Sequence, residues 1–276
     1  MPRFTTSDGL SLYYEDDGEG LPLLCLSGLT RNARDFDFVA PQLEGHRVIR
    51  LDYRGRGQSD WSKDYLSYNV PREAQDALEL LDHLGIEKAA ILGTSRGGLI
   101  AMGLAATVKD RLLGVVMNDI GPVLDPKGLD AIMGYLGIQP TFTDFDAMAT
   151  ARKAAMQATY PDVPLARWRK EVTHSHVATG DGIRLNYDPK LRDAVLEAGT
   201  TGAPDLWPFF EAIAPLPCAV IHGENSDLLS FETVAEMLRK NPDLIVAHVP
   251  NRAHIPFLDE PEAQSALSKW LRQLKE

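Results

Sequence analysis

Short apolar runs alternate along the chain with longer segments whose apolar residues recur every three or four positions. Apolar runs bounded by turn residues are typical of buried strands, and the longer spacing is typical of amphipathic helices. Expected strands, after a hairpin over residues 4–7 and 10–16, are residues 21–26, 47–51, 88–92, 112–118, 218–222 and 244–249. Expected helices are residues 35–43, 68–84, 97–107 and 231–240, with a last helix after Asp259.

This alternation predicts an α/β fold with a mostly parallel central sheet of about eight strands and helices on both faces. Residues 121–204 interrupt the alternation, because they carry helical patterns and no clear strand. The helical patterns cover residues 126–136, 145–160, 165–176 and 189–198. We therefore expect a core domain over residues 1–120 and 205–276, with residues 121–204 inserted as a helical lid.

Composition and charge serve only to exclude some classes of protein. The chain has 276 residues and a formal net charge of −11, which argues against a nucleic-acid partner because phosphate binding needs a basic surface. No apolar stretch approaches the ~20 residues of a membrane span, and residues 1–5 lack the apolar core of a signal peptide. A cytoplasmic protein is expected, with Cys25 and Cys218 as buried free thiols.

The segment Gly-Thr-Ser-Arg-Gly at residues 93–97 is the first candidate for chemistry. An expected strand leads into it and an expected helix leads out, which is the context of a nucleophilic serine on a strained turn. Gly93 and Gly97 flank Ser95 at the two positions where strand and helix come too close for a Cβ atom. The alternative interpretation is a glycine-rich connection without chemistry.

A serine nucleophile needs a general base, and the base needs an acid to orient it. Among the seven histidines, His254 follows the last expected strand and so lies at the same rim of the sheet as the serine turn. For the acid, Asp227 follows the preceding expected strand. Glu224 on the same loop and Asp119 after the strand at 112–118 stay open as alternatives.

Two backbone N–H groups are candidate donors to an oxyanion at Ser95. Arg96 opens the helix after the serine, so its N–H has no partner within the helix and lies at the positive end of the helix dipole. Gly28 lets the chain turn after the strand at 21–26, which would direct the N–H of Leu29 toward the serine. The alternative for Gly28 is a simple loop glycine.

Together these residues resemble the α/β-hydrolase fold family, in its lid-bearing branch. The specific motifs are GTSRGG, HGENSD, NRAH and DYRGRGQSD, in the family's order of nucleophile, acid and histidine. The resemblance implies a Ser95–His254–Asp227 triad with Leu29 and Arg96 as oxyanion donors. Many members have His-Gly where this chain has Ser27-Gly28.

The predicted function is a serine hydrolase that cleaves a small ester, lactone or thioester without a metal or organic cofactor. Hydrolysis of a carbon–carbon bond in a ring-fission diketone and a non-catalytic ligand receptor are the alternatives. His174 and His176 lack further ligands at metal-binding spacing, and residues 48–60 lack the third glycine of a dinucleotide loop. Arg31 and Trp168 are candidate contacts to a small-molecule substrate, no nucleic-acid or membrane partner is expected, and a homodimer is compatible with the sequence.

Overall fold

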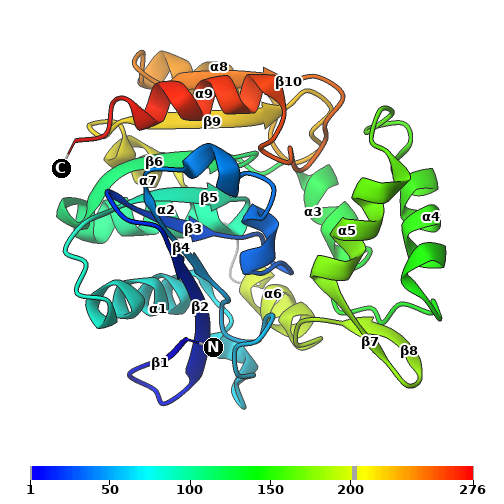
Figure 1. The fold of residues 1–276 in the computed structure, drawn as a ribbon. Helices are drawn as coiled ribbons and strands as arrows, with labels where there is room; N and C mark the ends of the chain where they lie inside the picture. The colour runs from blue at the N-terminus through cyan, green and yellow to red at the C-terminus, as the bar shows by residue number, and fades with distance from the viewer. Residues whose placement is uncertain (1, 201–203, 276) are drawn as a thin grey trace.

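A computed structural model describes residues 2–200 and 204–275, and its centre is a sheet of eight strands (Figure 1). The strands are β1 (Arg3–Thr5), β2 (Ser11–Asp17), β3 (Pro22–Leu26), β4 (Arg47–Leu51), β5 (Ala89–Thr94), β6 (Leu112–Asn118), β9 (Cys218–Gly223) and β10 (Ile245–Val249). Their order across the sheet is β1-β2-β4-β3-β5-β6-β9-β10. β2 pairs antiparallel with β1 and β4, and the other pairs are parallel. The predicted mostly parallel α/β sheet is confirmed.

Helices cover both faces of this sheet (Figure 1). They are α1 (Val70–His83), α2 (Arg96–Val108), α7 (Trp207–Ile213), α8 (Phe231–Lys240) and α9 (Pro261–Leu271). The first four share one apolar cluster with one face of the sheet, and α9 belongs to the cluster on the other face. Short 3-10 helices are η1 (Ala33–Phe36), η2 (Ala40–Leu43), η3 (Tyr65–Ser67) and η4 (Lys109–Arg111).

The centre of the sheet is buried on both faces. All six residues of β5 are buried, which explains why this strand appears in the sequence as an unbroken apolar run. Cys25 in β3 and Cys218 in β9 are buried free thiols, as predicted. The rigid centre thus carries β5 and β6, whose carboxyl ends hold the candidate site.

Residues 121–199 form a group of short elements beside the carboxyl ends of the parallel strands (Figure 1). They are α3 (Pro126–Met133), α4 (Phe145–Met156), α5 (Leu165–Ser175), β7 (His176–Thr179), β8 (Gly182–Leu185) and α6 (Leu191–Gly199). α4 and α5 pack on each other through a cluster that includes Met148, Trp168 and Val172. This small separate cluster lets the group sit over the sheet edge instead of merging into the main core.

Two local predictions are corrected. No strand was expected between 121 and 204, yet β7 and β8 form an antiparallel hairpin. Three of the four β7 residues are exposed, so the apolar alternation that marks a strand in the sequence is missing. The expected helix at 35–43 is instead the two turns η1 and η2, the second containing Pro41, which has no N–H to donate.

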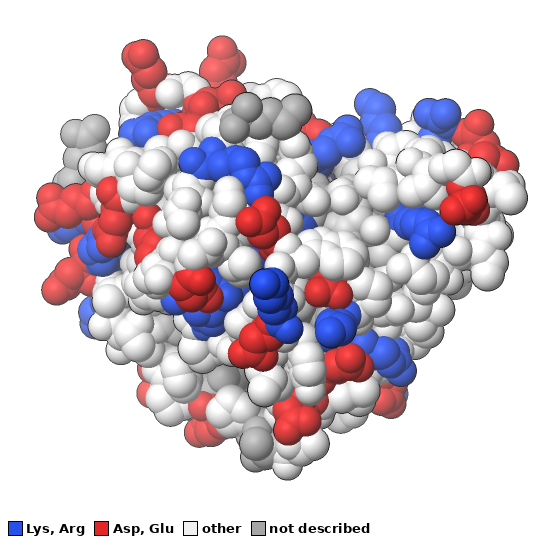
Figure 2. Space-filling view, turned by 90° about the horizontal axis from the view of Figure 1, so that it is seen from below, with Lys and Arg blue, Asp and Glu red and all other residues white. Residues whose placement is uncertain are grey.

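No helix in the described residues combines the length and apolarity needed to cross a bilayer. Figure 2 shows one face of the molecule, on which acidic and basic side chains are interspersed. The net negative charge is therefore not gathered into one field on this face.

Candidate active site

Ser95 lies at the sharp turn between β5 and α2, with a φ of 49° and a ψ of −110°. A positive φ is unfavourable for a residue with a side chain, so this turn is held in a strained conformation. Its own N–H donates to the carbonyl of Asn118 at 2.9 Å, which ties the turn to the end of β6. The turn thereby projects the Ser95 hydroxyl from the rim of the sheet.

The flanking glycines are required by close backbone contacts. A Cβ atom on Gly93 would lie 2.6 Å from backbone atoms of Gly97, and one on Gly97 would lie 2.0 Å from the carbonyl oxygen of Leu26. Neither distance leaves room for a carbon atom. The Gly-x-Ser-x-Gly spacing therefore reflects the packing of β5, α2 and β3 around the turn.

His254 comes from the loop after β10, and its ring is only 13% exposed. Its Nε2 lies 2.9 Å from Ser95 Oγ, which is hydrogen-bond distance. The structure thus brings together the two residues that the sequence proposed as nucleophile and base. A neutral imidazole with its proton on Nδ1 can accept the serine proton at Nε2.

Asp119 supplies the carboxylate that faces His254. It directly follows β6, is fully buried, and its Oδ2 lies 2.8 Å from His254 Nδ1. The same carboxylate accepts hydrogen bonds from Gly223 N–H at 2.7 Å and from Ser226 Oγ at 2.6 Å. Three donors therefore fix its position and offset the cost of burying it.

This arrangement corrects the sequence-based choice of Asp227. Asp227 is exposed, and among the described residues the carboxylate hydrogen-bonded to His254 is that of Asp119. Glu224, the other alternative, is also exposed. Because β6 lies between β5 and β9 in the sheet, the end of β6 is nearer to the serine turn. The loop after β9 contributes Ser226, which orients Asp119 instead of replacing it.

The two expected oxyanion donors lie on either side of the serine. A Cβ atom on Gly28 would be 3.9 Å from the Ser95 Cβ, so the loop after β3 runs directly past the turn. Arg96 is the first residue of α2. Within residues 2–200 and 204–275, no backbone hydrogen bond uses the N–H of Leu29 or of Arg96. Both N–H groups are available to a bound molecule.

A buried carboxylate connects these two donor residues. Glu73 in α1 accepts from Arg56 Nη1 at 2.6 Å and from Arg96 Nε at 2.6 Å. Arg56 in turn donates through Nε to the carbonyl oxygen of Leu29 at 2.9 Å. Despite burial, the cations of Arg56 and Arg96 hold the pKa of Glu73 below its usual value. Through Arg56, the DYRGRGQSD motif thus holds the two donor residues in position.

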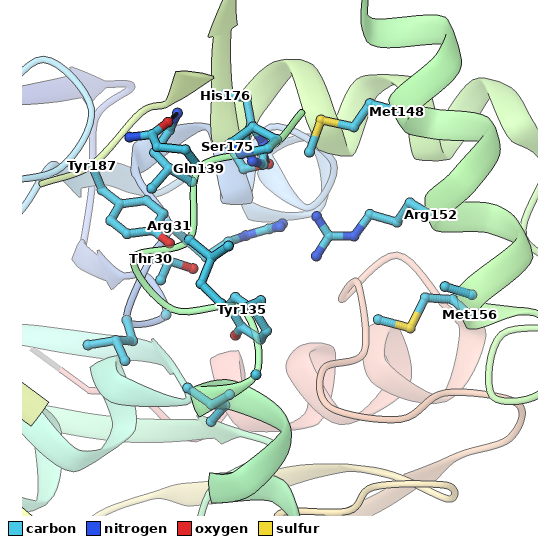
Figure 3. Close-up of a pocket in the computed structure, with 18 of the residues that line it drawn as sticks. Thr30, Arg31, Tyr135, Gln139, Met148, Arg152, Met156, Ser175, His176 and Tyr187 are labelled. Carbon is cyan, nitrogen blue, oxygen red and sulfur yellow. Dashed lines mark hydrogen bonds between the residues drawn. The ribbon is translucent and has the colours of Figure 1, made fainter. Parts of the chain in front are cut away.

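A cavity of about 510 Å³ is lined by Ser95 and His254 and by side chains from the segment between Ile132 and Tyr187. Figure 3 shows several of the side chains from this segment, together with Thr30 and Arg31. The size of the cavity suits a small organic ligand. Its polar lining outside the serine and histidine comes from Thr30, Arg31, Tyr135, Gln139, Arg152, Ser175, His176 and Tyr187. Among the described residues, no group of three or more potential metal ligands is present.

The predicted substrate contacts have different positions. Arg31 lines the cavity, but its guanidinium donates to Asp35 at 2.6 Å and to Glu171 at 2.5 Å. Trp168 is 4% exposed, packs on Tyr160 and Phe257, and is not among the residues that line the cavity. This placement corrects the expectation for Trp168, whose apolar ring fills the small cluster between α4 and α5.

Arg152, which lines the cavity, was not singled out by the sequence analysis. Arg152 lies in α4, a helix whose sequence is typical of any amphipathic segment. The only signal in the sequence is a cation between Met148 and Met156, four residues from each on the same helix face. Without the cavity, this spacing does not distinguish a ligand contact from a solvated arginine.

Comparison with known proteins gives the same fold. The chain matches the Alpha/beta hydrolase family over residues 23–267. A 3-hydroxybutyrate-oligomer hydrolase of Cupriavidus necator is 38% identical over 255 residues, which cover 89% of this chain and 86% of that protein. A 2-(acetamidomethylene)succinate hydrolase of Mesorhizobium japonicum is 27% identical over 89% of this chain and 85% of its own length. The crystal structure of an alpha/beta hydrolase from Novosphingobium aromaticivorans superimposes with a TM-score of 0.93 at 38% identity, covering 99% of this chain and 98% of that one.

Proposed function

Because this chain belongs to the alpha/beta hydrolase family, we propose that it is a serine hydrolase that cleaves a carboxylic ester through an acyl-enzyme. The observation that carries the proposal is the hydrogen-bonded series Ser95, His254 and Asp119, with distances of 2.9 and 2.8 Å. A lactone or a thioester presents the same acyl carbon and belongs to the same proposal.

In the first half of the proposed reaction, Ser95 Oγ attacks the ester carbonyl carbon and passes its proton to His254 Nε2. Asp119 accepts the hydrogen bond from Nδ1–H, which keeps the ring in the required tautomer and stabilises the imidazolium. The carbonyl oxygen becomes an oxyanion between the N–H groups of Leu29 and Arg96. A donor of this kind is worth roughly 3–4 kcal/mol of barrier.

Collapse of the tetrahedral intermediate breaks the bond to the alcohol oxygen, which takes the proton from His254. Water then enters, gives a proton to His254 and adds its hydroxyl to the acyl carbon. The second tetrahedral intermediate releases the acid, and Ser95 Oγ regains the proton from the ring. Atoms and charge balance without a cofactor.

The preference for an ester is supported by the relative at 38% identity, whose name describes hydrolysis of 3-hydroxybutyrate oligomers. Hydroxy-acid units in an oligomer are joined by ester bonds. Hydrolysis of a carbon–carbon bond would use the same three residues, and a receptor would need only the cavity. A half-buried hydroxyl that lines the cavity, held in a strained turn and hydrogen-bonded to an imidazole, favours an enzyme over a receptor.

The test is a hydrolysis screen over 4-nitrophenyl esters, lactones, thioesters and vinylogous diketones, with Ser95→Ala as the blank. We expect ester turnover with a burst of alcohol equal to one per active site wherever deacylation is slow, and no turnover by Ser95→Ala. Turnover of the diketones alone would show that the enzyme hydrolyses a carbon–carbon bond and not an ester. Ligand binding that is the same in wild type and Ser95→Ala, without turnover of any class, would contradict the proposal and favour the receptor.

A further inference from the structure

Arg152 is one of two cations that line the cavity without a part in the proposed reaction, and the other is Arg31. It shares one face of α4 with Met148 and Met156, and all three side chains line the cavity. Figure 3 shows its guanidinium directed into the space between α4 and the loop that carries Thr30 and Arg31. A cation thus stands in an otherwise apolar row of cavity-facing side chains.

The guanidinium of Arg152 has no protein partner. No hydrogen bond or ion pair joins it to another residue in the described part of the chain, 2–200 and 204–275. The other arginines near the site are paired with carboxylates: Arg31 with Asp35 and Glu171, and Arg96 with Glu73. Arg152 is therefore distinguished from its neighbours by a missing counter-ion.

The cavity wall offers no carboxylate to supply that counter-ion. Its lining, among the described residues, includes Arg31 and Arg152 but no aspartate or glutamate. Glu171 acts on Arg152 only at longer range, since its oxygens are engaged by Arg31 and Arg167. Burial and the nearby Arg31 cation lower the pKa of Arg152, so the charge is held at a cost in free energy. An anion entering the cavity would remove that cost.

His176 does not compete with Arg152 for an anion. Burial, reinforced by the Arg152 cation, lowers the pKa of His176 to about 4. At neutral pH it therefore faces the cavity uncharged. Neutral donors nearby, the hydroxyls of Thr30 and Tyr187 and the amide of Gln139, can add hydrogen bonds to an anion but carry no charge.

We propose that Arg152 binds a carboxylate of the substrate, so that the enzyme acts on esters of small molecules that also carry a free carboxylate. The inference rests on the proposed ester hydrolysis for the reacting end of the substrate. The acyl carbon would lie at Ser95 and His254, and the carboxylate at α4 across the same cavity. A guanidinium suits this task because its donors match the two oxygens of a carboxylate.

The test compares three pairs of esters, in which one member carries a free carboxylate and the other a methyl ester in its place. The pairs are the mono-4-nitrophenyl esters of glutaric, adipic and suberic acids and their methylated forms. We expect wild type to favour the acids in kcat/KM for at least one chain length. Arg152→Met should lower kcat/KM for that acid by about 10- to 100-fold and change the methyl ester less than about threefold. Arg152→Lys should keep part of the preference, since the charge stays but the paired donors are lost.

The matched control is Arg169→Met. Arg169 is exposed on α5 and pairs with Asp146 on α4, so its substitution should leave both rates unchanged. Fluorophosphonate labelling of Arg152→Met at the wild-type rate checks that the variant is folded around Ser95. Equal loss on both members of a pair in such a labelled variant, or no preference in wild type, would overturn the inference while leaving ester hydrolysis intact.

A second readout separates this inference from the function it rests on. Titration calorimetry of adipate and glutarate into Ser95→Ala measures carboxylate binding without any reaction. We expect binding that is weakened about tenfold or more when Arg152→Met is added to Ser95→Ala. Binding that depends on Arg152 in a chain that hydrolyses no ester would support the carboxylate site and overturn only the reaction. Binding that is indifferent to Arg152 would overturn the carboxylate site.

Discussion

Asp119 has a buried carboxylate that meets three donors, and one of them is His254 at 2.8 Å. Its backbone φ of 54° turns the chain at the end of β6 so that the side chain reaches the ring. Asp227 has none of these features, because it is exposed on the loop after β9. The role of the acid therefore falls to the one of the two aspartates that is hydrogen-bonded to the imidazole, Asp119.

Substitution of each aspartate by asparagine tests which of them orients His254. Asp119→Asn keeps the shape but puts an amide against the ring, which favours the wrong tautomer, and kcat/KM should fall by about 10³- to 10⁴-fold. Asp227→Asn should change kcat/KM by less than about twofold, as exposed substitutions away from a site do. Steady-state kinetics on the best ester of the screen make the comparison. A large loss in Asp227→Asn with a small one in Asp119→Asn would restore the sequence-based choice.

The sequence could identify Ser95 and His254 because each has a local signal. The serine is flanked by two glycines between an apolar strand and an apolar helix, and the histidine follows the last strand. The acid has no such signal, since aspartates follow both β6 and β9 and strand order alone decides which is near. The pairing of Arg31 with Glu171 and the lack of pairing of Arg152 depend on contacts between distant elements, which periodicity does not encode.

At the scale of elements, the site depends on how closely β5, α2 and β3 approach one another. Gly97 in the first turn of α2 faces the carbonyl of Leu26, the last residue of β3. β3 is hydrogen-bonded to β4 on one side and β5 on the other, so its backbone cannot move away. Two glycines of the same helix should therefore respond oppositely to an added methyl group.

Gly97→Ala puts a Cβ atom 2.0 Å from the Leu26 oxygen and should lower the free energy of unfolding by about 3 kcal/mol or more, or prevent folding. Gly103→Ala, two turns along α2, has no atom within 4 Å of the new Cβ and should raise that free energy by about 0.5–1 kcal/mol. Urea unfolding followed by circular dichroism measures both. Equal effects of the two changes would contradict the close-packed turn.

The elements that the sequence predicted best are those that pack in the two large apolar clusters on either face of the sheet. β5 and β6 appear as apolar runs and α1 as a three–four repeat because their partners cover them completely or on one face. The hairpin β7–β8 was missed, since three of the four β7 residues are exposed and β8 has only two buried apolar residues, Ile183 and Leu185. The insertion is predictable as helical but not in its arrangement, because its small clusters place weak demands on the sequence.

At the scale of the whole molecule, buried titratable groups make stability depend on pH with opposite signs. His176 has its pKa lowered from 6.5 to about 4 by burial, so the unfolded chain binds its proton first. Its contribution is fully present above pH 6.5 and is lost as the pH falls toward 4. Burial raises the pKa values of Asp35 and Asp52 to about 6. These two groups therefore increase the free energy of unfolding as the pH falls below 6. Only a difference between variants isolates one group.

His176→Asn removes one of these groups. The free energy of unfolding of wild type minus that of the variant should decrease by up to about 3 kcal/mol between pH 7 and pH 4. The two buried aspartates are common to both chains and cancel in the difference. Chemical unfolding at several pH values measures the trend. A difference that is flat over this range, or that grows as the pH falls, would contradict a buried neutral His176.

The surface adds little to the functional argument at this scale. Acidic and basic side chains are mixed on the face seen in Figure 2, and the chain as a whole carries a net charge of −11. This face therefore offers nucleic acid no continuous basic surface, while a small-molecule substrate and the absence of a nucleic-acid partner stay predictions. A cytoplasmic location, the lack of a membrane partner and a homodimer stay predictions.

The central claim is that Ser95 is a nucleophile activated by His254 and Asp119. Its most direct test is fluorophosphonate labelling followed by tryptic mapping, since cleavage after Lys88 and Arg96 isolates Ser95 in the peptide of residues 89–96. We predict one adduct per chain, in that peptide, with labelling abolished by Ser95→Ala and strongly slowed by Asp119→Asn. An adduct on another peptide, or ester hydrolysis that survives in Ser95→Ala, would contradict the account.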